Sequence, residues 1–542
     1  MRPAALRLGA LEEAVTRRLE ALAGQRFVER LWAKDPTLWS PRPLPELADR
    51  LGWLDLPAAM PPGVGELELL AREIREDGIR RVVLLGMGGS SLAPEVFSRC
   101  LPLSGEGCAL TVLDSTHPDA VLAAAGELDP ARTLLLVASK SGGTVETLSL
   151  FRFFWKRLGS AVAEPGRHVL AITDPGSPLE ALAGERRFRA VVTAPPDVGG
   201  RFSALSVFGM VPAALMGADP GALLDAARAM AHRCRRPPAE NPGLLLGAIL
   251  GEAALAGRDK LTLLTSPGLA ALPTWLEQLV AESTGKDGTG ILPVPRESVL
   301  DPASVGEDRL FVALALRGEG PPVPRGVLDA LVEAGHPVVE LGLEHPNELG
   351  AEMFRWEVAT AVAGAILGVH PFNQPDVQLA KELAKRALQG ELAAPPGGPA
   401  WDDPELPRRL AGLLGHLQAG SFLAVGAFLA PGPDTDAALL HLETALRRRG
   451  PWPVTTGYGP RFLHSTGQLH KGGPPGGVFL QLVDTPRSDA PIPETGAGFA
   501  RLVRAQADGD LGALARRGRP VLRVELGTTP VEAIRRLAAA CA

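Results

Sequence analysis

Glycines and hydroxyl side chains follow two apolar runs of this sequence. The first segment is V-V-L-L-G-M-G-G-S-S over residues 82–91, and the second is L-L-L-V-A-S-K-S-G-G-T-V-E-T over residues 134–147. An uncharged apolar run is typical of a buried strand in a parallel sheet. Glycines let the backbone turn tightly and approach a ligand, and the N–H groups at the start of a following helix attract an anion. Both segments therefore predict a phosphate-binding turn between a strand and a helix.

The candidate phosphate ligands lie in these two turns. In the second turn, hydroxyl groups flank a lysine at a helix start, so hydrogen bonds, the helix dipole and one positive charge favour the same dianion. Together the turns predict a site for a small phosphorylated molecule, formed by Gly88, Gly89, Ser90, Ser139, Lys140, Ser141, Thr144 and Thr147. The alternative for Ser141 and Thr147 is that each only caps a helix.

A third glycine-rich segment, D-V-G-G-R-F-S over residues 197–203, places Arg201 directly after Gly200. The glycines allow the backbone to come close to a ligand, and the guanidinium could then stabilise an oxyanion or an enediolate. An arginine in a structural ion pair behind a glycine turn is the alternative.

Glu282 is the candidate base. It lies near the end of a predicted helix, beside Gly285, where the negative end of the helix dipole would raise the pKa of a desolvated carboxylate. A base whose pKa is raised toward neutrality suits proton transfer between carbon atoms. A solvated glutamate at a helix end is the alternative.

Alternating strands and helices are expected to position these residues. In residues 65–215, strands are predicted at 82–85, 110–113, 134–138 and 169–173. Helices alternate with them and the strands end in polar residues, which is typical of a doubly wound parallel sheet with ligands at the carboxyl ends of its strands. A second α/β unit is predicted for residues 216–392, with strands at 261–264, 310–314 and 338–341.

The remaining segments are expected to surround these two units. Residues 1–64 predict a helical strap with a helix at 11–32, and the Pro- and Gly-rich residues 393–405 predict a linker. Residues 406–542 predict a C-terminal α/β extension that begins with a strand at 422–428. Its segment G-R-P-V-L-R-V-E-L-G echoes G-H-P-V-V-E-L-G of the second unit, so the extension could be a third, partial copy of the same unit.

These motifs resemble those of a known family. The two phosphate turns look like the sugar-isomerase domain, in which a phosphosugar lies over the strand ends, and G-G-R-F-S resembles a signature of glucose-6-phosphate isomerases. Ala204 and Pro196 depart from that signature in ways that concern packing more than chemistry. The segment from Gln278, Q-L-V-A-E-S-T-G-K, resembles the isomerase segment that carries the catalytic base. The resemblance implies that Glu282 is this base.

A further resemblance implies an active-site lysine. The segment F-N-Q-P-D-V-Q-L-A-K over residues 372–381 is similar to an isomerase signature that ends in an active-site lysine, which is Lys381 here. The same resemblance implies that Gln374 binds the substrate. The chain departs from the signature with Asp376 in place of a small residue and with Gln378 in place of Glu.

The resemblance also points to a histidine in the extension. Bacterial isomerases have an L-H-S-x-G-Q segment whose His takes part in ring opening, and this chain has L-H-S-T-G-Q-L-H-K-G-G over residues 463–473. The chain has no His between Glu282 and His336, so His464 is the candidate and His345 the fallback. A purely structural histidine is the alternative.

The resemblance implies both a fold and a reaction. The expected fold is α/β, with two doubly wound parallel-sheet domains, each an α-β-α sandwich of the sugar-isomerase type, plus the α/β extension. The chain is most similar to the isomerase half of fusions between transaldolase and glucose-6-phosphate isomerase. The implied reaction converts glucose 6-phosphate and fructose 6-phosphate into each other through a cis-enediolate, without a cofactor. A non-catalytic phosphosugar sensor and an isomerase that also accepts mannose 6-phosphate remain open.

Composition argues against other classes of protein. The chain of 542 residues is 46% hydrophobic and 21% charged, and no apolar run reaches the roughly 18 to 20 residues of a membrane helix. A net charge of −6 without an aromatic-rich basic segment argues against nucleic acid, and four scattered cysteines predict neither disulfides nor a metal site. We expect a cytoplasmic protein that binds a phosphorylated hexose. It could form a homodimer or act beside a separate transaldolase.

Overall fold

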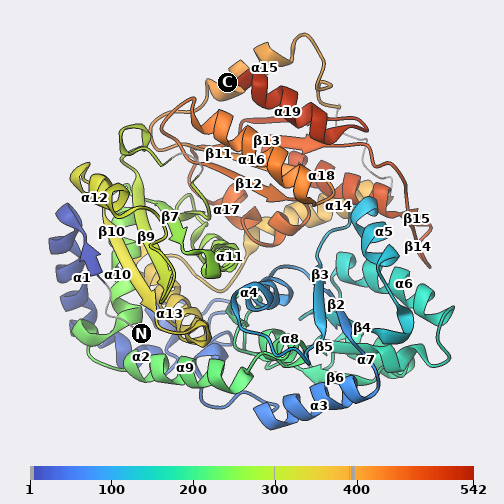
Figure 1. Cartoon of the computed structure of the whole chain (residues 1–542). Coiled ribbons are helices and arrows are strands. Elements are labelled where there is room, and N and C mark those ends of the chain that lie inside the picture. The colour runs from blue at the N-terminus through green and yellow to red at the C-terminus, as the bar shows by residue number, and fades with distance from the viewer. Residues whose placement is uncertain (1–4, 298–299, 390, 392–396, 542) are drawn as a thin grey trace.

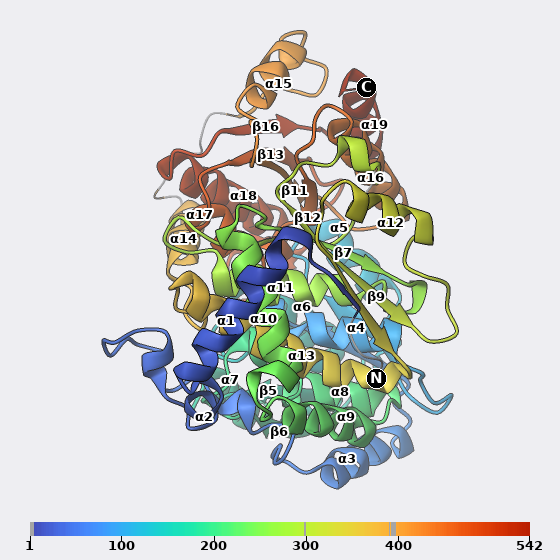
Figure 2. The same ribbon diagram turned by 90° about the vertical axis from the view of Figure 1, so that its left-hand side faces the viewer.

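The computed structural model describes residues 5–297, 300–389, 391 and 397–541. In this part of the chain, three sheets form three α/β units, each flanked by helices; two of the sheets are parallel, and the second is parallel except for one edge strand. The third unit, orange to red, lies above the other two in both views (Figures 1 and 2). The predicted fold class, α/β with doubly wound parallel sheets, is confirmed.

The first unit contains a parallel sheet in the order β3-β2-β4-β5-β6. Its strands are β2 (Arg81–Leu85), β3 (Ala109–Leu113), β4 (Thr133–Ala138), β5 (Val169–Thr173) and β6 (Ala190–Thr193). Its helices are α3 (Val64–Glu76), α4 (Leu92–Cys100), α5 (Pro118–Gly126), α6 (Val145–Gly159) and α7 (Pro178–Glu185). All residues of β4 and β5 are buried, because helices cover both faces of the sheet. The sequence did not reveal β6, a short edge strand that is only partly buried.

The second unit contains a sheet in the order β1-β10-β9-β7-β8, in which β1 alone is antiparallel to its neighbour. Its strands are β1 (Ala5–Arg7), β7 (Lys260–Thr265), β8 (Leu292–Val294), β9 (Arg309–Leu316) and β10 (Val338–Leu343). Its helices are α8 (Val207–Met216), α9 (Pro220–Arg233), α10 (Pro242–Leu255), α11 (Leu272–Thr284), α12 (Arg325–Glu333), α13 (Leu349–Leu367) and α14 (Gln378–Gln389). Helices α10 and α13 pack against each other in the core.

The third unit contains a parallel sheet in the order β12-β11-β13-β16 and a small hairpin of β14 and β15. Its strands are β11 (Phe422–Phe428), β12 (Val454–Tyr458), β13 (Gly477–Val483), β14 (Pro491–Ile492), β15 (Ala497–Gly498) and β16 (Val521–Glu525). Its helices are α15 (Leu406–Leu414), α16 (Pro433–Arg447), α17 (Gly467–Gly472), α18 (Phe499–Arg516) and α19 (Pro530–Cys541).

The three sheets share one strand order. Numbered within each unit along the chain, the first four parallel strands lie in the order 2-1-3-4. The echoed sequences noted above form β10 and β16, and each of these is the fourth parallel strand of its unit. The common order supports the hypothesis that the third unit is a partial copy of the others.

Two predicted segments differ from the structure. The helix predicted for residues 11–32 is two helices, α1 (Glu12–Gly24) and α2 (Phe27–Trp32), because Arg26 between them adopts a left-handed conformation with φ of 52°. Residues 393–396 of the predicted linker lie outside the described residues. Later in that segment, Ala400 forms a β-bridge with Glu525, so this part runs along the edge of the third sheet.

None of the helices in the described ranges combines the length and the apolar character that crossing a membrane requires.

Candidate functional site

A cavity of about 730 Å³ lies where the three units meet. The first unit contributes its two glycine-rich turns, the second contributes the end of α11 and the start of α14, and the third contributes residues near α17 and α18. All but two of the predicted site residues line it, namely Gly88, Gly89, Ser90, Lys140, Ser141, Thr144, Gly200, Arg201, Glu282, Gln374, Lys381 and His464. The two exceptions are Ser139 and Thr147. The topology therefore brings together motifs that are spread over nearly 400 residues.

The turn after β2 packs directly on the turn that carries Arg201. Gly88 has φ of 54°, a left-handed conformation that favours glycine. A Cβ atom on Gly89 would lie 2.0 Å from the carbonyl oxygen of Gly200. The two glycine-rich turns can therefore approach each other only because Gly89 has no side chain, and Ser90 follows at the cavity wall.

The turn after β4 differs in part from the prediction. Ser141 and Thr144 line the cavity, but Ser139 is buried and its hydroxyl is 2.9 Å from the hydroxyl of Thr144. Thr147 is also buried, one turn into α6. Neither residue is among those that line the cavity, and the Thr147 hydroxyl has no hydrogen-bond partner among the described residues.

Lys140 reaches the cavity wall, where its charge already has a partner. Its Nζ donates to Asp174 Oδ2 at 2.6 Å and to the carbonyl oxygen of Pro196 at 3.2 Å. The sequence motif does not reveal this ion pair, because Asp174 follows a different strand, β5. Lys140 therefore presents a partly neutralised charge to a ligand in the cavity.

Arg201 and Glu282, which both line the cavity, form a buried ion pair. Arg201 Nη1 is 2.9 Å from Glu282 Oε1. Arg201 also donates from Nη2 to the carbonyl oxygens of Pro371 and Asn373, at 2.9 and 2.7 Å, and from Nε to Ser283 Oγ at 2.9 Å. Burial lowers the pKa of Arg201, and the charge of Glu282 opposes this effect. The contacts fix the guanidinium beside the carboxylate, a pairing that the sequence prediction for Glu282 did not include.

His464 enters the cavity from the third unit. Its Nε2 is 3.0 Å from Glu146 Oε1, which also accepts a hydrogen bond of 2.8 Å from Gln506 Nε2. Burial raises the pKa of Glu146, but the charge and hydrogen bond of His464 outweigh it, so the pKa is below its usual value. His345, the fallback candidate, caps the short helix of residues 346–348 and does not line the cavity.

Gln278 connects His464 to Glu282. Its side-chain Nε2 donates to the carbonyl oxygen of His464 at 2.9 Å and to Glu282 Oε2 at 3.0 Å. One buried amide thus holds the backbone of the third unit beside the carboxylate of the second.

Lys381 lies on the first turn of α14 with an exposed side chain that lines the cavity. Its charge contributes to the lowered pKa of Glu146. Nearby, Asp376 departs from the isomerase signature. Its Oδ2 accepts a hydrogen bond of 2.6 Å from Gln468, and its Oδ1 pairs with Arg517. Both partners belong to the third unit, so the departure serves the contact between units.

Several lining residues were not predicted as site residues, and the signals for them differ. Glu146 stands inside the second turn motif, where a carboxylate beside a predicted anion site could have been noticed. Gln278 precedes Glu282 by one helical turn, which suggests contact. Lys471 lies in the same L-H-S-T-G-Q-L-H-K-G-G segment as His464, which could have pointed to it, whereas no motif in the sequence relates Gln506 to this cavity. Among the described residues, no group of three or more His, Cys, Asp or Glu side chains could hold a metal ion.

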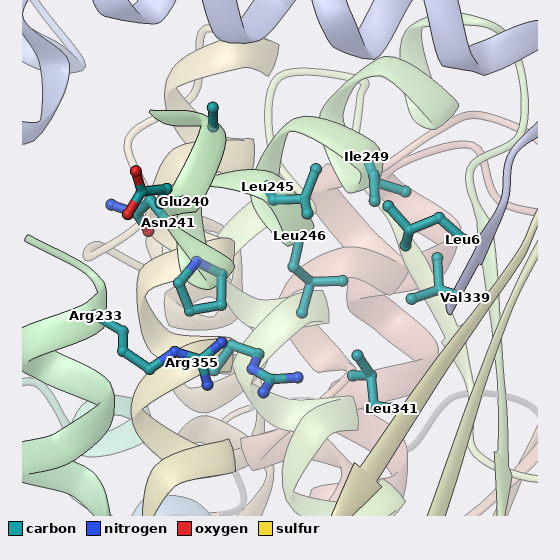
Figure 3. A pocket seen from close by; sticks show the side chains of 12 residues that line it. Leu6, Arg233, Glu240, Asn241, Leu245, Leu246, Ile249, Val339, Leu341 and Arg355 are labelled. Atoms are coloured by element: carbon teal, nitrogen blue, oxygen red, sulfur yellow. The ribbon is translucent and has the colours of Figure 1, made fainter. Parts of the chain in front are cut away.

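A second, smaller cavity of about 290 Å³ lies apart from this site, between β1, α10 and β10 (Figure 3). Apolar side chains such as Leu246 and Val339 line one side, and Arg233 and Arg355 line the other. None of the predicted site residues lines this second cavity.

Comparison with known proteins gives consistent matches. A family model described as phosphoglucose isomerase matches residues 73–291. A glucose-6-phosphate isomerase of Rubrobacter xylanophilus is 30% identical over 385 residues, covering 62% of this chain and 89% of the relative. One of Thermus thermophilus is 33% identical over 398 residues, covering 64% and 92%.

Solved structures agree with these matches. A hypothetical protein of Thermus thermophilus superposes with a TM-score of 0.61 at 30% identity, covering 71% of this chain and 100% of that chain. A glucose-6-phosphate isomerase of Chlamydia trachomatis gives 0.56 at 19% identity, covering 76% and 91%, and so shares the fold.

Proposed function

The chain belongs to the phosphoglucose isomerase family and interconverts glucose 6-phosphate and fructose 6-phosphate, and we propose that it does so in the cavity between its three units. One observation carries the proposal for the site. The Arg201–Glu282 ion pair lies in the same cavity as both phosphate turns, as isomerisation of a sugar phosphate requires.

The phosphate group is held by the first unit in this proposal. Ser90, Ser141 and Thr144 offer hydroxyl groups, and the turns offer backbone N–H groups at helix starts. Ser139 supports Thr144 through their shared hydrogen bond. Lys140 adds positive charge, reduced by Asp174.

Glu282 transfers the proton in this proposal. Its carboxylate removes the proton from C2 of the open-chain aldose and so forms a cis-enediolate. The same proton returns to C1, while the hydroxyl proton of O2 passes to O1 and C2 becomes the ketone carbonyl. As the proton arrives, negative charge leaves the carboxylate and appears on the enediolate oxygens, while Arg201 stays beside both. A fixed guanidinium of this kind stabilises the developing charge by about 3 kcal/mol. Proton transfer by a positioned group contributes roughly 10²- to 10⁴-fold in rate.

Ring opening precedes this step, because the substrates are mostly cyclic. One proton must leave the anomeric hydroxyl and another must reach the ring oxygen. His464, oriented by Glu146, and Lys381 are the groups we assign to these transfers. Gln374 also lines the cavity, and we assign it a contact with the sugar.

The first test is turnover of fructose 6-phosphate by the purified chain, read through a glucose-6-phosphate dehydrogenase couple. Glu282→Gln keeps the size of the side chain and removes the base, so kcat should fall by roughly 10²- to 10⁴-fold. Glu333→Gln, at the exposed end of α12, is the matched control and should keep full activity.

Two results would contradict the proposal. Full activity of Glu282→Gln would remove Glu282 as the base. An inactive wild-type chain that fructose 6-phosphate still protects against unfolding would favour a sensor.

A homodimer, a separate transaldolase partner and a cytoplasmic location remain predictions. Light scattering of the purified chain tests the first of these.

A further inference from the structure

Arg461 joins the third unit to the first, three residues before His464. It begins the short helix of residues 461–464, which directly follows β12 and its turn. Its Nη2 pairs with Glu95 of α4, and its Nη1 lies 3.3 Å from Oδ2 of Asp114, which follows β3. The guanidinium therefore has two anchoring points on separate elements of the first unit.

A third carboxylate faces Arg461 from the second unit. Glu277 of α11 interacts electrostatically with the guanidinium. Burial raises the pKa of Glu277 to about 7, even though the positive charge of Arg461 acts in the opposite direction. Burial also raises the pKa of Asp114, which Arg461 again opposes. Burial lowers the pKa of Arg461, but the carboxylates of Asp114 and Glu95 outweigh this effect and raise it above its usual value. One cation thus compensates acidic side chains from both other units.

The same short helix is also held at its other end. The carbonyl oxygen of His464 accepts the hydrogen bond from Gln278, the residue after Glu277. A Cβ atom on Gly88 would lie 2.8 Å from this carbonyl oxygen, so the helix packs tightly on the first phosphate turn. Arg461 and His464 are the first and last residues of this four-residue 3-10 helix, so a change in where the helix begins also changes where His464 lies.

We propose that Arg461 is a positioning residue that sets the place of His464 in the cavity. By binding Glu95 and Asp114 at two points, it fixes where the helix of residues 461–464 begins, and hence where the imidazole meets Glu146. This inference rests on the proposed role of His464 in isomerisation. A purely structural ion pair between units is the competing explanation.

The structure offers a matched control for that competing explanation. Arg447 is another buried arginine of the third unit, and it donates to Glu297 Oε1 at 3.0 Å and to the carbonyl oxygen of Ser304 at 3.1 Å, both in the second unit. It does not line the main cavity. Its removal should weaken the contact between units without moving His464.

The experiment compares Arg461→Met with Arg447→Met in the full chain. We expect kcat for fructose 6-phosphate to fall roughly 10- to 100-fold in Arg461→Met, because misplacing a reacting group by about 1 Å can cost on the order of 100-fold. The inhibition constant of inorganic phosphate should change less than kcat, because Arg461 acts on the first phosphate turn indirectly, through Asp114, which accepts a hydrogen bond from Ser91 Oγ at 3.2 Å. Arg447→Met should lower the unfolding temperature but keep kcat.

Arg461→Lys is the second variant, because Arg461→Met leaves buried carboxylates without a cation and can fail to fold. A lysine keeps the charge but, as a single ammonium, cannot reproduce the forked two-point contact. We expect a folded protein with reduced kcat. Wild-type kcat in Arg461→Lys, or an equal loss of kcat in Arg447→Met, would overturn the proposal.

A spectroscopic readout separates this inference from the proposed reaction. The imidazole signals of His464, assigned by comparison with His464→Asn, should shift in NMR spectra of Arg461→Met or Arg461→Lys and stay in place in Arg447→Met. This result would support the positioning role even if the wild-type chain did not turn over fructose 6-phosphate. Unchanged His464 signals in both Arg461 variants would contradict it.

Discussion

At the scale of single residues, the orientation of the His464 imidazole depends on one carboxylate oxygen. Glu146 Oε1 receives both His464 Nε2 and Gln506 Nε2, and Thr116 in turn donates to Gln506 at 2.6 Å. Because Gln506 occupies the same oxygen, Glu146 cannot easily rotate away from the imidazole. The histidine of the third unit is thus oriented by a residue of the first.

His464→Asn should therefore affect chemistry more than binding. We expect kcat for glucose 6-phosphate to fall roughly 10²- to 10⁴-fold, as for the loss of a positioned acid or base. The inhibition constant of inorganic phosphate should hardly change, because His464 contributes no group to the phosphate turns. Steady-state kinetics with phosphate as inhibitor check both values, and unchanged turnover would exclude His464 from ring opening.

Sequence alone identified most of the candidate residues that line the cavity, because these lie in contiguous motifs, but it did not separate them from buried neighbours in the same motifs. Lys381 and Glu282 could be identified because their motifs repeat a family pattern. Ser139 and Thr147 belong to the same motif as Ser141, yet they are buried and do not line the cavity. Such a difference depends on the path of the backbone through the turn, which composition does not reveal.

At the scale of elements, the two glycine-rich turns are fitted to each other. The turn after β2 and the turn with Arg201 meet where Gly89 faces the carbonyl oxygen of Gly200. This contact sets the distance between the phosphate site and the guanidinium, so a small displacement there changes both.

Gly89→Ala should disrupt this fit. The added Cβ would lie 2.0 Å from a backbone carbonyl that has no flexible side chain to yield, so one turn must move. We expect kcat/KM to fall by roughly 100-fold, the usual cost of about 1 Å of misplacement. Gly184→Ala in α7, with no atom within 4 Å of its added Cβ, is the control. Equal activity of both variants in the coupled assay would contradict this explanation.

Long apolar strands were predicted well, whereas short strands were not. β5 and β11 have the predicted bounds, and both are almost fully buried. β1 and β8, of three residues each, were missed. Three residues carry too little pattern to separate a strand from a loop, and their pairing partners lie far away in the sequence.

At the scale of the whole molecule, the third unit closes the main cavity. Gly288 N donates to the carbonyl oxygen of Gly472 at 2.9 Å, and a Cβ on Gly285 would lie 2.5 Å from Leu469. These contacts hold the loop after Glu282 against α17. The alignments with the relatives from Rubrobacter xylanophilus and Thermus thermophilus cover 89% and 92% of those proteins, but only 62% and 64% of this chain. A substantial part of this chain is thus additional to them.

Stability of the whole chain should depend on pH through Glu357, in the core helix α13. Its side chain is fully buried, neither carboxyl oxygen hydrogen-bonds to a described residue, and burial raises its pKa well above 4.5. The unfolded chain releases this proton near pH 4.5, while the folded chain keeps it. Stability therefore falls as pH rises above 4.5 toward the raised pKa, by about 1.4 kcal/mol per pH unit.

Glu357→Gln removes this proton equilibrium. The free energy of unfolding of the variant, relative to wild type, should therefore increase from pH 5 to pH 7, as measured by urea denaturation. The exposed Glu333→Gln is the control and should show no such trend. A difference between Glu357→Gln and wild type that is the same at both pH values would exclude Glu357 as the source.

The pairing of β1 with β10 also has a consequence for how the chain is made. Ala5 pairs with Glu340, so the ribosome must add 335 further residues after Ala5 to reach its partner. At about 5 to 20 residues per second, this takes roughly 20 to 70 s. During translation, β1 therefore waits without its partner, and the second sheet gains its last strand only after most of the polypeptide has been synthesised.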